Sequence, residues 1–155
     1  MTVKVLKGAV ITGIINGLIN GVIQWFSFRD YQSIPVSVDS ITNETLTVLG
    51  SGVHLAITLA MILTFVAYFS IEHKKRPSWG KLIWLIVKHG FFTFGVVTGL
   101  SVLWQYYVGT VEVSPLTAVF LVGLIAGVVA GVVNYLTISP YVEDVASIKN
   151  GETVS

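Results

Sequence analysis

Residues 8–28 read GAVITGIINGLINGVIQWFSF, a run of 21 residues without a charged side chain. Glycine recurs at every fourth position in this run, and again in the stretch GLIAGVVAG at residues 123–131. The two glycine ladders consist of Gly13, Gly17 and Gly21, and of Gly123, Gly127 and Gly131. In lipid, apolar side chains gain little by touching each other, so helices associate through close backbone approach and buried polar contacts. The ladders therefore predict glycine-zipper packing of helices inside a bilayer.

The composition agrees with a membrane location. Of the 155 residues, 54% are hydrophobic and 11% are charged, and the mean hydropathy is +0.81, whereas about a quarter of a soluble domain is charged. The formal net charge of +1 argues against a nucleic-acid partner, which requires a concentrated basic face. The chain has no cysteine, which excludes disulfides and thiolate-held metals.

Hydropathy divides the chain into four membrane spans within one integral membrane domain, residues 1–155. The spans cover about residues 8–28, 49–71, 82–107 and 116–138, and a helix of 21 residues reaches about 31 Å, the thickness of the hydrocarbon core. Between them lie an outer loop (29–48), in which alternating Ile34, Val36 and Val38 suggest a short extended piece, and a basic inner turn (72–81). We expect the polar tail (139–155) to fray after Pro140.

Basic residues set the orientation of the spans. Lys4 and Lys7 precede the first span, and four basic residues lie between the second and the third, whereas the outer loop holds only Arg29. Because basic residues stay in the cytoplasm, we expect an antiparallel four-helix bundle with both termini and the 72–81 turn on the cytoplasmic side. The expected location is the cell membrane, specifically a bacterial inner membrane.

Polar residues recur at every fourth position of the first span. They are Thr12, Asn16, Asn20 and Gln24. Each step of four rotates only about 40° around a helix, so the stripe follows one face. Carboxamides near the membrane midplane must face protein or water, which leaves two interpretations: interhelical hydrogen bonds, or the wall of a polar conduit. The other spans could complete either arrangement with His54, Thr58, Thr98, Ser101, Gln105 and Asn134.

Lys88 and His89 form a second candidate site, because Lys88 lies about 9 Å inside the third span. Its side chain either snorkels to the cytoplasmic surface or faces the bundle and needs a counter-charge, for which Glu72 is the nearest acid. An anionic substrate or a lipid headgroup is the other source of negative charge. The basic turn, with Lys74, Lys75 and Arg76, either binds lipid headgroups or only sets topology.

No cofactor is expected. The depths of His54 and His89 differ by about 12 Å, too much to clamp one haem iron, and a metal site lacks ligands. Gly95 and Gly99 of the third span are further candidates for helix packing.

Three functional classes remain. We favour an oligomeric small channel or transport unit for an ion or a small neutral solute, since the spans lack the carboxylates of proton relays. The alternative is a non-catalytic membrane subunit that binds a partner protein. A lipid-active membrane enzyme comes last, because no nucleophile–base pair or acid pair is present, and enzymatic activity is not expected. The expected partners are the lipid bilayer and either further copies of the chain or another membrane protein.

Overall fold

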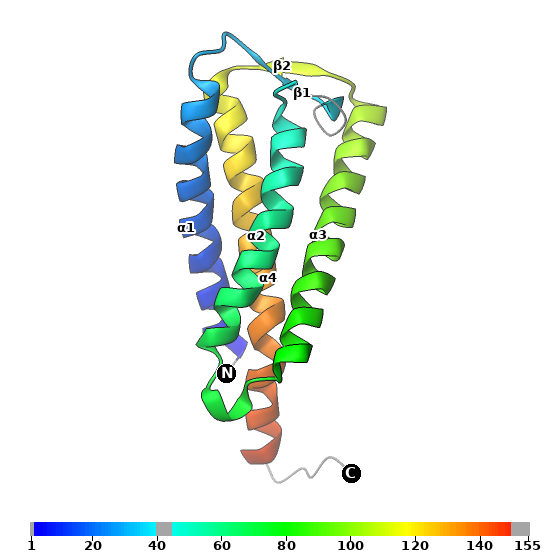
Figure 1. Cartoon of the computed structure of the whole chain (residues 1–155). Coiled ribbons are helices and arrows are strands. Elements are labelled where there is room, and N and C mark those ends of the chain that lie inside the picture. Colours follow the sequence, from blue (N-terminus) through cyan, green and yellow to red (C-terminus); the bar gives the residue numbers. More distant parts are fainter. Residues whose placement is uncertain (1, 40–44, 150–155) are drawn as a thin grey trace.

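The computed structural model describes residues 2–39 and 45–149, with side chains for residues 3–39 and 45–142. These residues form four long helices, which lie alongside one another (Figure 1). The helices are α1 (Thr2–Phe28), α2 (Val48–Ser70), α3 (Trp79–Tyr107) and α4 (Pro115–Lys149). Each is long and apolar enough to cross a membrane. The all-helical class and the four spans that the sequence predicts are therefore confirmed, and the protein is a multi-pass membrane protein.

Helices α1, α3 and α4 extend beyond the spans predicted from hydropathy, whereas α2 matches its span within one residue at each end. Helix α1 begins at Thr2 instead of residue 8, and α3 begins at Trp79 instead of Leu82. Charged and polar residues end a hydrophobic run without ending a helix, since the backbone hydrogen bonds continue into the headgroup region. Residues 40–44 of the outer loop lie outside the described residues.

The expectation that the chain frays after Pro140 is wrong, because α4 continues through Pro140 to Lys149. A proline inside a helix removes the hydrogen bond of its own nitrogen and crowds the preceding turn, but the turns on either side keep their bonds. The polar residues from Glu143 to Lys149 belong to the same helix. Residues 150–155 lie outside the described part of the chain.

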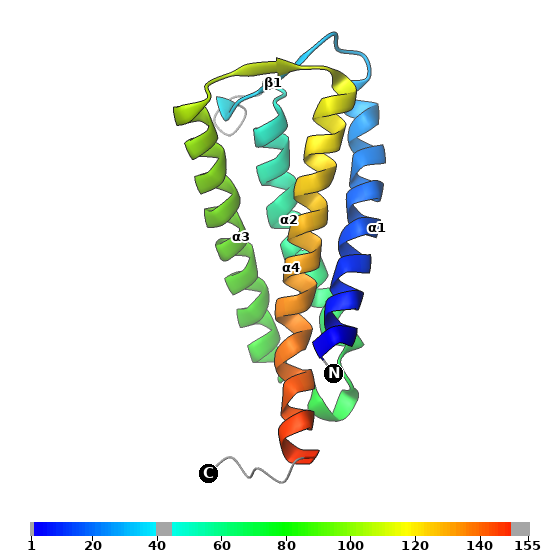
Figure 2. The ribbon, with the colours of Figure 1, turned by 180° about the vertical axis from the view of Figure 1, so that it is seen from behind.

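The extensive helix interfaces join α1 to α4, α4 to α2 and α2 to α3. The start of α1, the end of α4 and the turn between α2 and α3 lie at one end of the molecule (Figure 1). Seen from behind, α4 runs alongside α1, while α3 lies on the opposite flank (Figure 2). Helices α1 and α3 are therefore the two flanks of the arrangement, and each has one principal neighbour.

The two glycine ladders face each other across the α1–α4 interface. A Cβ atom added at Gly13 would lie 2.7 Å from the carbonyl oxygen of Gly127, and one added at Gly17 would lie 2.9 Å from that of Gly123. Real Cβ atoms do not approach a backbone oxygen this closely, so glycine is required for the helices to meet. The contact continues with wider spacing at Gly21 and Gly131.

Helix α4 uses a second face against α2. That interface buries small residues of both helices, with larger aliphatic side chains beside them. Its members are Ala56, Leu59, Ala60, Leu63, Ala126, Val129, Ala130 and Val133. Because small residues line both faces of α4, this helix lies at close distance to two neighbours and connects α1 to the rest of the molecule.

Two short strands cover the end of the molecule away from the chain termini. Strand β1 (Ile34–Val36) pairs with β2 (Val111–Val113) in antiparallel register, with Ile34 opposite Val113. Ile34 and Val36 are buried in a cluster that includes Phe28 of α1. The extended piece predicted in the outer loop is confirmed over β1, whereas its pairing with the α3–α4 loop was not predicted.

Candidate functional site

The buried and half-buried residues of α3 are mostly polar from the middle of the helix to its C-terminal end. The polar residues on this face are His89, Thr93, Thr98, Ser101 and Gln105. From the first to the last is 16 residues, or about 24 Å along a helix, compared with about 30 Å for the hydrocarbon core. These five residues, which we call the polar track, spread over about half of the helix circumference, since His89 and Thr98 are nine residues apart. They are the candidate functional site.

His89, at the N-terminal end of this track, joins three helices. Its side chain is 5% exposed, and its Nδ1 atom lies 2.9 Å from Thr64 Oγ1 of α2 and 3.5 Å from Thr137 Oγ1 of α4. The shorter contact is a good hydrogen bond and the longer one is at the limit. The imidazole therefore ties α3 to α2, and more weakly to α4, at one level of the bundle.

The two threonines determine which nitrogen of His89 carries its hydrogen. Each hydroxyl lies 2.7 Å from the carbonyl oxygen four residues earlier in its own helix, at Ala60 and at Val133. A hydroxyl has a single hydrogen to donate, and donating it to this carbonyl leaves the oxygen as an acceptor. With both hydroxyl hydrogens on these carbonyls, Nδ1 of His89 carries a hydrogen and donates it to Thr64 Oγ1.

Two polar atoms toward the C-terminal end of α3 lack a hydrogen-bond partner among the described residues. Thr98 Oγ1 and Gln105 Oε1 are buried and have no hydrogen-bond partner among the described residues. By contrast, Ser101 Oγ donates to the carbonyl of Val97 at 2.8 Å, and Gln105 Nε2 donates to Thr110 Oγ1 at 3.1 Å. An unsatisfied polar atom inside the hydrocarbon core costs several kcal/mol, and Thr98, about 8 Å from the midpoint of α3, lies at such a depth. These two atoms are therefore places where water or a solute gains a hydrogen bond.

The amides of the first span are bonded within their own helix. Asn16 Nδ2 donates to the carbonyl of Thr12, and Asn20 Nδ2 to that of Asn16, both at 2.8 Å. Asn20 is buried, while Thr12, Asn16 and Gln24 are half-buried. The interhelical hydrogen bonds that the sequence allowed are not seen for these amide nitrogens, because a carbonyl one turn earlier is within reach of each.

The remaining polar candidates lie on α2 and α4, away from the polar residues of α3. His54 and Thr58 are exposed on α2, where Thr58 Oγ1 donates to the carbonyl of His54 at 3.1 Å, and Asn134 is half-buried on α4. The structure does not gather these residues and the α1 amides around one conduit. It groups His89 with Thr64 and Thr137 instead.

Sequence reasoning missed Thr64, Thr93 and Thr137. A usable signal existed for Thr64, which continues a series of small residues at every fourth position after Gly52, Ala56 and Ala60. Such a series marks a face where helices meet, so its next polar member is a candidate for interhelical bonding. Thr137 follows Ala130 by seven residues, which is the same face two turns later.

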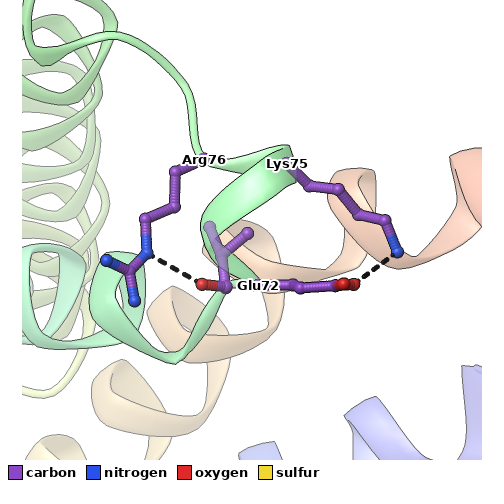
Figure 3. A network of polar contacts seen from close by, with 4 residues as sticks. Glu72, Lys75 and Arg76 are labelled. Carbon is purple, nitrogen blue, oxygen red and sulfur yellow. Dashed lines mark hydrogen bonds and ion pairs between the residues drawn. The ribbon is translucent and has the colours of Figure 1, made fainter.

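Two basic residues of the inner turn, Arg76 and Lys75, bind other groups of the same chain. Arg76 donates from Nε to the carbonyl of Ile71 at 2.8 Å and from Nη2 to that of Phe69 at 2.7 Å. These bonds satisfy carbonyls at the end of α2, as basic side chains do at helix C-termini. Lys75 Nζ pairs with Glu72 Oε2 at 2.8 Å, and both the ion pair and the Arg76 Nε bond are visible in Figure 3.

Lys88 is exposed and does not pair with Glu72, so the counter-charge expected for an inward-facing Lys88 is not used. Farther along α3, a Cβ atom added at Gly95 or Gly99 would meet no described atom within 4 Å. Unlike the ladders of α1 and α4, these two glycines do not pack against another helix of the described chain.

No family model matches this chain, and neither a curated protein nor a solved structure matches it. The function is therefore argued from the geometry alone.

Proposed function

We propose that the protein is a membrane transport unit for an ion or a small neutral solute, and that the path follows the inner face of α3. The observation that supports this most is the polar track from His89 to Gln105, with two buried and unpaired oxygen atoms at Thr98 and Gln105. Helix packing alone does not require unpaired oxygens, because glycine and alanine suffice for close approach. A permeating molecule that donates hydrogen bonds would satisfy them.

The chemistry of the track indicates the class of solute. It offers hydroxyl, carboxamide and imidazole groups, and none of the four candidate spans contains Asp or Glu. Proton-coupled transporters use relays of carboxylates or histidines, and a single imidazole held by Thr64 does not make a chain. We therefore propose passive movement down a gradient.

The proposed orientation places both termini in the cytoplasm, with the four helices antiparallel, in a bacterial inner membrane. The positive-inside bias supports this, because the basic α2–α3 turn, the start of α1 and the end of α4 lie at the same end of the molecule (Figure 1). His89 then lies in the cytoplasmic half of the track, and Gln105 lies near the outer surface. Assembly into a homo-oligomer stays a prediction.

Flux through vesicles tests the proposal. Purified protein is reconstituted, and the uptake of glycerol, urea, K⁺ and Cl⁻ is measured by stopped-flow light scattering and ion-sensitive dyes. The double variant Thr98→Val, Gln105→Leu removes the unpaired oxygens of α3, and we expect it to slow the flux of the permeant solute about tenfold, equivalent to about 1.4 kcal/mol in the barrier.

The matched control is the double variant Asn16→Leu, Asn20→Leu, which removes two amides of α1. Because those amides are bonded to their own helix, we expect its flux to stay near that of the wild type. If the α1 variant loses flux and the α3 variant keeps it, the path does not follow α3. If the wild-type protein raises no flux above that of empty vesicles, the transport proposal is wrong.

A further inference from the structure

The side of α3 that points away from the other described helices, which we call its outer face, carries Lys88 and the two glycines Gly95 and Gly99. Gly95 and Gly99 follow Lys88 by seven and eleven residues, which places all three within about 20° of one line along a helix. All three are exposed. The large side chains around them are exposed as well, namely Trp84, Phe91, Phe92, Val102, Leu103 and Tyr106. No described helix covers this face.

Lys88 lies within the hydrophobic part of the helix. Helix α3 has 29 residues and is about 43 Å long, and Lys88 lies about 8 Å from its midpoint. In a core of about 30 Å, that is about 7 Å below the surface. Lys88 forms no ion pair with a described residue. A lysine at this depth either extends its side chain to the headgroup region or gains from a carboxylate beside it.

The glycines favour a helix over lipid as the occupant of this face. A lipid chain adapts to any surface, whereas a helix gains dispersion contacts where glycine lets the backbones approach. In this chain the glycine ladders of α1 and α4 already pack against each other. The pair on α3 is the corresponding surface left open within the described residues.

A second copy of the chain does not fit this face. Its candidate spans contain no Asp or Glu, so it has no carboxylate to offer at the depth of Lys88. A two-fold symmetric contact would also place one Lys88 near the other, because such an interface uses the same patch on both subunits. Like charges at short distance in low dielectric repel each other strongly.

We infer that the outer face of α3 binds a transmembrane helix of another protein, which carries a carboxylate at the depth of Lys88 and small residues opposite Gly95 and Gly99. The carboxylate neutralises the lysine, and the small residues allow close approach. This inference does not depend on the transport proposal, because it concerns the exposed residues Lys88, Gly95 and Gly99 and not the buried polar residues of α3.

Synthetic helices test this surface directly. Fluorescent peptides of leucine and alanine are made with one Gly-x-x-x-Gly pair and one Glu, placed seven residues to either side of the pair, together with matched Gln peptides. Each is added to labelled full-length protein in phosphatidylcholine vesicles, and binding is measured by energy transfer. We expect one of the Glu peptides to bind about tenfold more tightly than its Gln counterpart.

Variants of the chain decide which residues recognise the peptide. Lys88→Gln should abolish the preference for Glu over Gln, whereas Lys74→Gln, a change of the same type in the inner turn, should keep it. Gly99→Leu should weaken both peptides alike, since it changes shape and not charge. Equal binding of the Glu and Gln peptides to the wild type, or a preference that survives Lys88→Gln, overturns the inference.

Discussion

Single glycine positions determine how closely α1 approaches α4. We predict that Gly13→Ala destabilises the protein by about 1–3 kcal/mol, the usual cost of inserting a methyl group into a closed contact, because the new Cβ would lie 2.7 Å from a carbonyl oxygen. Gly8→Ala is the matched control in the same helix, since nothing lies within 4 Å of its added Cβ. The measurement is the thermal unfolding temperature in nanodiscs. Equal temperatures for the two variants would contradict the ladder-to-ladder contact.

Residue types alone do not indicate which polar side chains form hydrogen bonds to another helix. Asn16 and Asn20 were the strongest candidates, yet their amide nitrogens bond to carbonyls of their own helix. His89 was considered as an anion or haem site, and it instead contacts threonines from two other helices. A side chain in a helix can reach its own backbone or a neighbour, and the choice depends on what lies opposite.

At the scale of elements, one arginine shapes the α2–α3 turn. We predict that Arg76→Lys loosens this turn, because a single ammonium cannot reproduce the two directed bonds of the guanidinium to Ile71 and Phe69. The expected result is faster backbone hydrogen exchange across residues 69–78, with the charge and the membrane orientation unchanged. Lys74→Arg should leave the exchange rates as they are, and an equal acceleration in both variants would refute the capping role of Arg76.

Helix positions were predictable from hydropathy, and helix ends were not. Hydropathy reports where the lipid core begins, whereas a helix ends where its backbone hydrogen bonds end. Helix α3 therefore begins at Trp79, ahead of the predicted Leu82, and α4 passes through Pro140. The β1–β2 pairing was beyond the reach of local patterns, since its strands are contributed by loops far apart in the sequence.

For the whole molecule, the proposed orientation is directly measurable because the chain contains no cysteine. We predict that Ser33→Cys, next to β1, reacts with a membrane-impermeant maleimide on intact cells. Ser78→Cys, at the start of α3, should react only after the membrane is opened. Both serines are exposed, so access depends on the side of the membrane. The reverse pattern of labelling would place the termini outside.

Composition and the spacing of apolar, glycine and basic residues were sufficient for the four spans, the close-packing ladders and the expected orientation, because these depend on transfer into lipid and on local helix geometry. Which ladder meets which, the three-helix contact at His89 and the open face at Lys88 were decided by tertiary structure. A helical period tells which residues share a face, but each span has several faces and several possible neighbours. Only the packing of all four helices selects among them.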